Sequence, residues 1–460
     1  MWTDALGNPV TLRSEDSLAP LNDFVEGFIA SEARAVNILQ AQEDASPLVQ
    51  ACCAALHMFA ESAQAPRHAR PFIERAQAGA GDASVREQRF IAAVAAWVDG
   101  DIARAIALHE EQAREFPRDL VALKLGQYHL FNRGDAPGML RLALPALPAA
   151  ADVHYLHGML AFAWEQCHFL EEAEASARRA IAMRRKEPWA HHALAHVLLT
   201  QGRLSEGYAF LQDVSATWTG LNSFMVTHNW WHQALFALEL DRADEVLALH
   251  DRHVWAEVKE YSQDQINAVS LLARAELAGI AVGDRWQDLA HHLAQRSHDH
   301  VLPFLDLQYL YGLARAGRVQ EARGWLASIE THALRRSGDD APVWQRVCVP
   351  AARGLLAHAT GDWKTAVEAL GHALPRMVEI GGSHAQRDLF AQIHLDALVN
   401  GGHLAGAQNL LQPQLRAQPE SRRLRRQAAK LYAALGLPSV AAGLAPPEGF
   451  ASPPEGRTPA

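Results

Sequence analysis

The chain has 460 residues, of which 49% are hydrophobic and 20% are charged, and its formal net charge is −10. This composition can bury a large core, which excludes an intrinsically disordered chain. An acidic chain without a basic stripe argues against nucleic acid and anionic membrane surfaces as partners. The four cysteines form no CxxC pair, so neither a disulfide framework nor a cysteine zinc site is expected. No secretory signal and no run of about 18 apolar residues is recognisable, so we expect a cytoplasmic protein outside membranes.

A turn signal followed by a charged, Ala-rich helix start recurs along the chain. It lies at Gly100, Gly134, Cys167, Gly202, Asp241, Gly283, Gly317, Gly361 and Gly402. The successive spacings of 34, 33, 35, 39, 42, 34, 44 and 41 residues bracket the roughly 34-residue tetratricopeptide period. Between the turns, apolar residues recur at helical spacing, as in Leu194, Val197 and Leu198. We therefore predict an all-α, tetratricopeptide-like superhelix (solenoid) of about nine to ten helical hairpins.

The ends of the chain depart from this periodicity. We expect residues 1–23 to form an irregular entry arm and residues 24–436 to form the solenoid. Residues 437–460 are rich in Pro, Gly and Ala without any period, which predicts a disordered tail.

Histidines recur at one repeat phase. His192 and His196 are spaced i and i+4 on one predicted helix, so they project from one face. His228 and His232 follow 36 residues later at the equivalent positions of the next first helix, and a further step of 36 leads from His228 to Asp264. Because packed helices lie about 8–10 Å apart, we expect nitrogens of the two pairs to approach within about 8 Å.

Imidazole and carboxylate groups are the ligands of Zn and other transition-metal sites, and imidazole is also the usual general base near neutral pH. We therefore interpret His192, His196, His228 and His232 as candidate ligands of a divalent transition metal such as Zn. As catalytic candidates we name Glu165, His192, His228 and Asp264. The HxxxH spacing lacks the Glu of the zincin motif, and the alternative is that these histidines only bond one stacked helix to the next.

Two further features accompany this histidine pattern. Trp231 is the expected wall of the pocket, whereas Trp230 points elsewhere. In the segment Gly381–Phe390, Ser383 is the expected N-cap of a helix, and Arg387 near that N-terminus is a plausible seat for an anion. Alternatively, Arg387 and Asp388 form a structural ion pair. We recognise no serine-nucleophile elbow and no phosphate-binding loop.

Several stretches up to about residue 419 resemble the tetratricopeptide repeat protein 38 family. They include REQRF at 86–90, PWAHHALAHV at 188–197, HNWWHQAL at 228–235, DHVLPFLD at 299–306 and GGSHAQRD at 381–388. The resemblance implies an α-solenoid and no particular activity. The sequence departs from the family pattern at Asn267, Leu305 and Gln308. It places these residues at motif positions: His192, His196, His228, Asn229, Trp231, His232, Asp264, Asp306, Gln386, Arg387 and Asp388.

Two functions follow as hypotheses. The first is an interior pocket that binds a small molecule, with a metal-dependent hydrolase as the candidate enzyme because metals activate water. Its substrate-binding candidates are Asn229, Trp231, Asp306, Gln386, Arg387 and Asp388. The alternative is an adaptor that binds a protein partner, gripping its peptide in the concave groove. A homo-oligomer is compatible with both. A capped cavity with converging imidazoles favours the pocket, and an open concave channel with exposed, separated imidazoles favours the adaptor.

Overall fold

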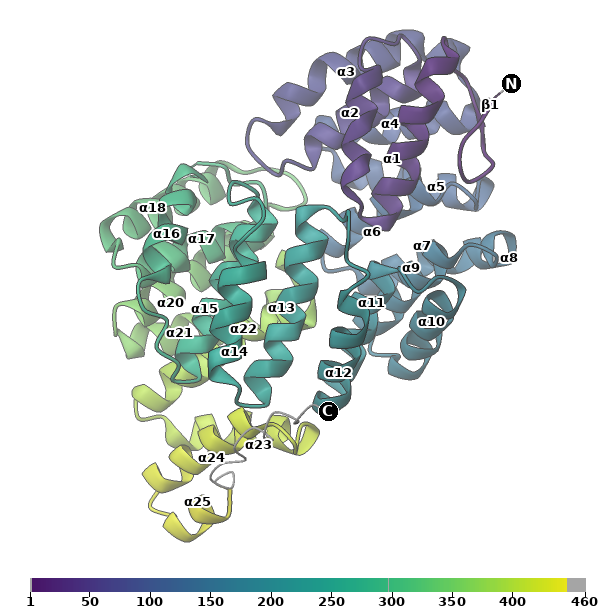
Figure 1. Cartoon of the computed structure of the whole chain (residues 1–460). Coiled ribbons are helices and arrows are strands. Elements are labelled where there is room, and N and C mark those ends of the chain that lie inside the picture. Colours follow the sequence, from purple (N-terminus) through teal and green to yellow (C-terminus); the bar gives the residue numbers. More distant parts are fainter. Residues whose placement is uncertain (1, 297, 445–460) are drawn as a thin grey trace, which may run out of the picture.

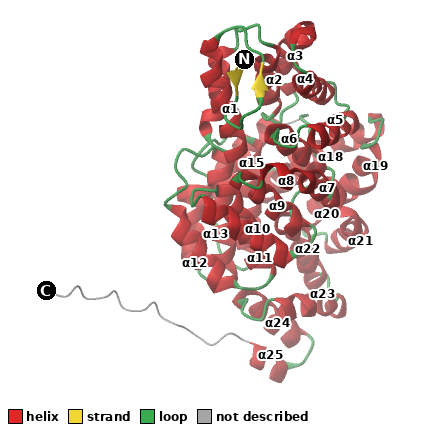
Figure 2. Ribbon diagram, turned by 90° about the vertical axis from the view of Figure 1, so that its right-hand side faces the viewer, coloured by secondary structure: helices red, strands yellow, loops and turns green. Residues whose placement is uncertain are grey.

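The computed structural model describes residues 2–296 and 298–444, and most of this part of the chain is helical (Figure 2). Two short antiparallel strands, β1 (Trp2–Thr3) and β2 (Pro9–Val10), are the only strands in the described residues. The predicted all-α class is therefore confirmed.

The helices follow one another with short connections. The first half contains α1 (Leu18–Ala30), α2 (Pro47–Met58), α3 (Ala65–Gly79), α4 (Val85–Val98), α5 (Ile102–Glu115), α6 (Leu120–Asn132), α7 (Ala136–Ala143), α8 (Leu147–Ala150), α9 (His154–Gln166), α10 (Leu170–Met183), α11 (Pro188–Thr200) and α12 (Leu204–Ser215). The second half contains α13 (Ser223–Glu239), α14 (Ala243–Leu249), α15 (Ser262–Leu277), α16 (Arg285–Leu293), α17 (Pro303–Arg315), α18 (Val319–Arg335), α19 (Ala341–Val343), α20 (Val349–Ala359), α21 (Trp363–Ala373), α22 (His384–Asn400), α23 (Leu404–Ala417), α24 (Arg422–Ala434) and α25 (Pro438–Leu444).

Consecutive helices pack as hairpins. All nine predicted turns join such a pair, from α4 and α5 to α22 and α23. The pairs α2–α3 and α24–α25 lie at the two ends without the turn motif, so the described residues form eleven hairpins, slightly more than the sequence predicts.

The turns place one residue in the left-handed region, which glycine adopts without strain. Gly202, between α11 and α12, has φ 70°. In the turns that lack glycine, His168 and Asp241 adopt the same conformation, with φ 62° and 63°. The turn geometry therefore persists where the sequence signal is weak.

First and second helices differ in burial, as the superhelix requires. Nearly every residue of the first helix α11 from Ala190 to Leu198 is buried. In the second helix α12, only a stripe that includes Tyr208 and Leu211 is buried. Side chains of first helices therefore form the interior, and the histidine-bearing helices α11 and α13 belong to it.

The superhelix curves so that late repeats meet early ones, and α22 lies close to α15 (Figure 1). The loop before α22 contains Gly381 and Gly382, with φ 79° and 77°. A Cβ on Gly381 would lie 2.9 Å from the backbone of Asn132, and one on Gly382 would lie 2.7 Å from the ring of Phe304. These two glycines therefore allow the loop to approach α6 and α17 closely.

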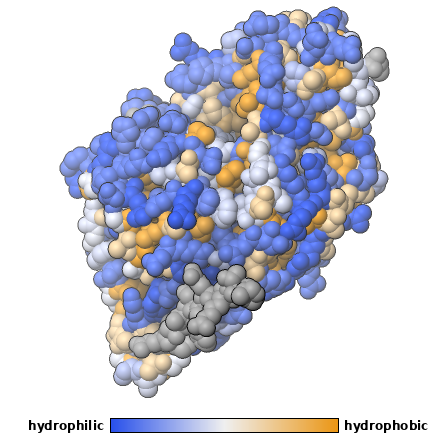
Figure 3. Space-filling view, in the orientation of Figure 1, coloured by the Kyte–Doolittle hydropathy of each residue, from blue (hydrophilic) through white to orange (hydrophobic). Residues whose placement is uncertain are grey.

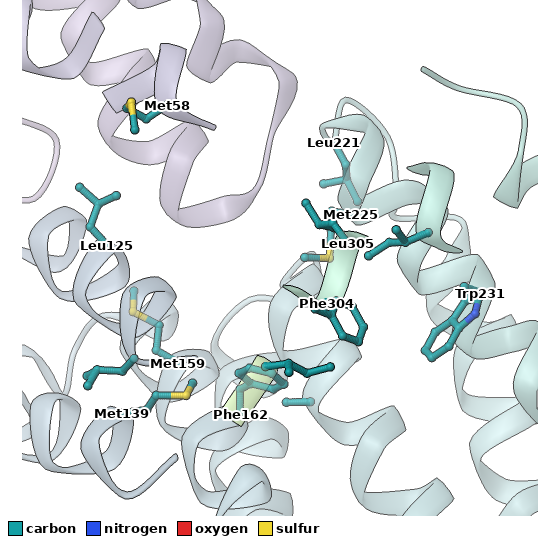
Figure 4. Packing of buried hydrophobic residues seen from close by; sticks show 14 of the residues in the cluster. Met58, Leu125, Met139, Met159, Phe162, Leu221, Met225, Trp231, Phe304 and Leu305 are labelled. Atoms are coloured by element: carbon teal, nitrogen blue, oxygen red, sulfur yellow. The ribbon is translucent and has the colours of Figure 1, made fainter. Parts of the chain in front are cut away.

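One continuous hydrophobic cluster runs through the hairpins up to α22, and a smaller one joins α22, α23 and α24. Figure 4 shows part of the large cluster, including Phe162, Trp231 and Phe304. The face in Figure 3 is mainly hydrophilic, with scattered apolar patches. Among the described residues, no helix combines the length and the apolar character that crossing a membrane requires.

The ends differ in part from the predicted boundaries. Helix α1 begins at Leu18, inside the segment expected to be irregular, and the two strands pair within the same segment. At the other end, α25 occupies residues 438–444 of the expected disordered tail. Residues 445–460 lie outside the described part of the chain.

Candidate functional site

Four buried imidazoles form the candidate site. His192 and His196 of α11 and His228 and His232 of α13 each offer a ring nitrogen, and these nitrogens all lie within 4.8 Å of one another. Each of the four residues is at most 2% exposed. The predicted convergence of the two pairs is confirmed, and we call these four residues the imidazole cluster.

Three Nε2 atoms make the closest approach within the cluster. His192 Nε2 lies 3.0 Å from His196 Nε2 and 3.2 Å from His228 Nε2. A neutral ring nitrogen carries either one hydrogen or one lone pair, so His192 Nε2 cannot donate to both neighbours. The three nitrogens are close enough to share one ligand atom or ion.

The outer nitrogens of two rings face oxygen atoms. His228 Nδ1 lies 2.9 Å from Asn267 Oδ1 on α15, and the Asn267 amide is oriented by donating to Thr227 Oγ1. His196 Nδ1 lies 3.6 Å from a carboxylate oxygen of Glu165 on α9. Both contacts favour a proton on Nδ1, which leaves the Nε2 lone pair of His196 and of His228 facing the cluster.

Asp264 has a different place from the predicted one. It accepts a hydrogen bond from Thr227 Oγ1 at 3.0 Å and one from the backbone N–H of Val258. It reaches His228 only through Thr227 and Asn267. Asp264 therefore orients the groups behind an imidazole, and the direct partner of His228 is Asn267, one helical turn further along α15. Burial raises the pKa of Asp264 to about 7.

Burial favours the neutral form of three of the four imidazoles. Burial lowers the pKa of His192 and of His232, and the neighbouring imidazoles lower each further. Burial also lowers the pKa of His228, to about 3. Burial is the largest influence on Glu165 and would raise its pKa, but His196, His384 and Gln166 together hold that pKa below its usual value. Neutral imidazole is the form of histidine that binds a metal cation.

Several buried polar atoms around the cluster have no hydrogen-bond partner among the described residues. They include both ring nitrogens of His232, both amide atoms of Asn229 and Nε1 of Trp231. One oxygen of Glu165 and Nδ1 of His192 also have no partner among the described residues. Since native proteins seldom leave buried polar groups unpaired, these atoms are available to contact a ligand.

Aromatic rings surround the imidazoles. Trp231 stacks on His228 with ring centroids 5.1 Å apart and an interplanar angle of 12°. Phe162 of α9 lies 5.0 Å from the ring of His192. Trp230 instead stacks on His253, outside the cluster. Phe162 was absent from our candidate residues, because an isolated apolar residue on a helix gives no functional signal.

The start of α22 contacts the end of α9, which carries Glu165. His384 Nε2 lies 3.1 Å from the backbone oxygen of Gln166, next to Glu165. Burial lowers the pKa of Arg387 to about 10, and the nearby charge of Glu165 opposes that shift. Arg387 donates to the backbone oxygen of Gly382 and forms no ion pair with Asp388. The guanidinium therefore lies within electrostatic reach of Glu165.

The neighbours of Arg387 serve the fold. Ser383 caps α22 as predicted, and the Gln386 side chain completes that cap by accepting from the Ser383 backbone N–H at 2.9 Å. Asp388 pairs with Arg274 of α15 at 2.8 Å. The side chains of Gln386 and Asp388 are thus engaged in structural contacts, which differs from their predicted role in binding substrate.

Asp306 also differs from its predicted place. Its carboxylate is completely buried and contacts His300 Nδ1 at 2.5 Å. The contacts of this carboxylate involve none of the four imidazoles. His300 precedes α17 in a loop with an unusual backbone, and its position could not be read from helical spacing.

No family model matches the chain. Similar solved structures include the human IFIT1 dimer with PPP-AAAA, which is 12% identical over 94% of both chains with a TM-score of 0.43. The Naa15/Naa10 complex bound to HypK-THB is 12% identical over 93% of this chain and 68% of that chain, with a TM-score of 0.25. The APC/C hetero-tetramer Cut9–Hcn1 is 12% identical over 83% of this chain and 89% of that chain, with a TM-score of 0.28. Such distant likeness carries no statement about binding or activity. The helical hairpins themselves define the class: the chain is a tetratricopeptide-type α-solenoid.

Proposed function

We propose that the imidazole cluster binds a divalent transition metal such as Zn and is the centre of a hydrolase-type site for a small molecule. The observation that carries this proposal is the approach of the Nε2 atoms of His196 and His228 to that of His192, at 3.0 and 3.2 Å. Tetrahedral ligands with bonds of about 2.1 Å to Zn are about 3.4 Å apart, so these nitrogens need to move only slightly.

The ligand set has three close members and one looser member. His192, His196 and His228 supply the close Nε2 atoms. His232 lies within reach, and neither of its ring nitrogens has a hydrogen-bond partner among the described residues. Three protein ligands leave a fourth position open for water or substrate, as catalytic sites require. His232 would then either complete the ligand set or face that open position.

The bound metal would supply Lewis-acid activation of a water molecule and of the substrate. Glu165 would orient His196 through Nδ1, and its unpaired oxygen is available to accept a proton. Arg387 would bind an anionic group of the substrate, because its guanidinium lies 3.5 Å from the ring of His384, which contacts the backbone next to Glu165. Trp231 and Phe162 would exclude water around the imidazoles.

The resemblance to the tetratricopeptide repeat protein 38 family agrees with this proposal, since the four histidines, Asn229 and Trp231 lie at its motif positions. Burial and convergence of the imidazoles meet one part of the criterion for a pocket, the converging imidazoles. A protein partner or a second copy bound on another face of the superhelix is compatible with the same centre.

Metal content tests the proposal directly. We expect untagged protein purified without chelators to carry close to one equivalent of a transition metal by mass spectrometry. The variant His196→Asn should carry less than a tenth of that amount, whereas His291→Asn, which changes an exposed histidine of α16, should match the wild type. Equal metal in wild type and His196→Asn, or none in either, would refute it.

The role of Arg387 has its own test. Acetate and inorganic phosphate are simple anionic probes, and we expect the zinc-loaded protein to bind at least one of them in calorimetry. Arg387→Met should weaken that binding at least tenfold with an unchanged melting temperature. If instead the melting temperature falls and anion binding persists, Arg387 only supports the loop before α22.

A further inference from the structure

A carboxylate, an imidazole and a hydroxyl contact one another between α17 and α18. His300 Nδ1 contacts Asp306 Oδ2 at 2.5 Å, and His300 Nε2 lies 2.7 Å from Ser328 Oγ. Acid, imidazole and hydroxyl thus follow one another in the order and through the same ring nitrogens as in serine hydrolases. We call Asp306, His300 and Ser328 the Ser328 relay. None of them belongs to the imidazole cluster.

The direction of the hydrogen bonds in the Ser328 relay follows from the carboxylate. Asp306 is completely buried and, when ionised, only accepts, so the proton of neutral His300 is on Nδ1 and Nε2 has the lone pair. Ser328 therefore donates its hydroxyl hydrogen to His300 Nε2. His298 Nδ1 lies 3.1 Å from the same oxygen, and since the hydroxyl has only one hydrogen, His298 must donate to it.

The backbone around His300 is strained, with φ 72° at His298 and 43° at His300. Such conformations concentrate at functional sites, where surrounding contacts enforce them. Asp299, between the two histidines, accepts from the backbone N–H of Ala63 at 3.1 Å and pairs with Arg296 at 3.2 Å. These contacts hold the loop that places His300 between Asp306 and Ser328.

The residues around the Ser328 relay limit the movement of the His300 ring and the way in which a substrate can approach. The ring of His332, one helical turn beyond Ser328, lies 4.8 Å from that of His300, and Trp344 lies 6.1 Å from it. Ser328 is half-buried on α18, a second helix of its hairpin, and His298 is exposed. A substrate therefore has to present its reacting group at the surface.

We propose that the Ser328 relay is a second, metal-independent catalytic site that hydrolyses small carboxylic esters. Ser328 Oγ bonds to the ester carbonyl carbon and its proton passes to His300 Nε2. The ester C–O bond then breaks, and the departing alcohol takes that proton. Water attacks the acyl group in the same way and releases the acid and the Ser328 hydroxyl. One ester and one water give one acid and one alcohol, without any change of oxidation state.

Labelling with a fluorophosphonate, which phosphonylates activated serines, tests this inference in the full-length protein. We expect one adduct, located on Ser328 by peptide mass spectrometry, at an unchanged rate in the presence of a chelator. Ser328→Ala should abolish the adduct. Ser176→Ala, a matched change of a half-buried serine on α10, should leave it unaltered.

Two further variants test whether Ser328 reacts because His300 activates it or only because it is accessible to the reagent. His300→Asn keeps a residue that tolerates a left-handed backbone but removes the base, and it should slow labelling about 100-fold. Asp306→Asn should also slow it, because the amide no longer fixes the proton on Nδ1. Absence of an adduct on Ser328 in the folded wild type, or unchanged labelling in His300→Asn, would overturn the proposal.

Discussion

The Oδ1 atom of Asn267 lies 2.9 Å from His228 Nδ1, and this contact decides which nitrogen of His228 faces the other imidazoles. The Asn267 amide is itself held, because it donates to Thr227 Oγ1 at 3.2 Å. A neutral His228 therefore has its proton on Nδ1 and its lone pair on Nε2. Orientation of a metal-ligating imidazole by such an acceptor is general in metalloproteins.

Removal of this acceptor should weaken metal binding without removing a ligand. We expect Asn267→Leu to lower the affinity for Zn²⁺ by about 10–100-fold, because His228 loses the contact that fixes its tautomer. Asn267→Asp, with a stronger acceptor, should bind at least as tightly as the wild type. Competition with a chelating dye measures both constants. Asn400→Leu, at an exposed position of α22, is the control, and equal affinities for it and Asn267→Leu would contradict this assignment.

The closure of the superhelix depends on Gly382. An alanine there would combine a φ of 77° with a Cβ 2.7 Å from the Phe304 ring, so overpacking adds about 1–3 kcal/mol to the backbone strain. Gly402→Ala has a similar φ of 78° and no atom within 4 Å, so it isolates the strain of about 1–2 kcal/mol. Thermal unfolding should therefore show a clearly larger loss for Gly382→Ala. Equal losses would mean that Phe304 does not constrain the loop.

A buried histidine outside both sites should make stability depend on pH. His109 is buried, stacks on His129, and has its pKa lowered to about 4 by burial. Below about pH 6.5 the unfolded chain takes up a proton at this residue, and the folded chain does not. The free energy of unfolding should thus fall as the pH drops from about 6.5 to about 4, by up to about 1.4 kcal/mol per pH unit for this residue.

Urea unfolding of wild type and His109→Leu across this pH range measures the contribution. The variant lacks the titrating ring, so its stability should fall less steeply with decreasing pH. Parallel pH profiles for the two proteins would show that His109 takes up its proton equally in both states.

Helical periodicity predicted much of this fold because each turn leaves a local signal. The nine turns from Gly100 to Gly402 all join helices that pair. The equal phase of His192 and His228 likewise predicted convergence correctly, since stacked repeats preserve which face of a first helix points inward. The hairpins α2–α3 and α24–α25 lack the turn motif, and α25 lies in the segment that was predicted to be disordered.

Exact partners were harder to predict, since step lengths between repeats vary. A constant step of 36 leads to Asp264, but the residue that contacts His228 is Asn267, one turn away on the same helix. Rotation of α15 by part of a turn changes the partner, and spacing alone does not give that rotation. Ser328 and His300 meet through a loop with a left-handed backbone, which carries no periodic signal.

A cobalt titration tests the central claim, metal binding by the imidazole cluster, most directly. Metal-stripped, untagged protein is titrated with Co²⁺ while the visible absorption of the ion is recorded. We predict saturation at one equivalent with the intense bands of a four-coordinate nitrogen site, loss of these bands in His196→Asn, and their retention in His291→Asn. No saturable spectrum in the wild type, or the same spectrum in His196→Asn, would contradict the account.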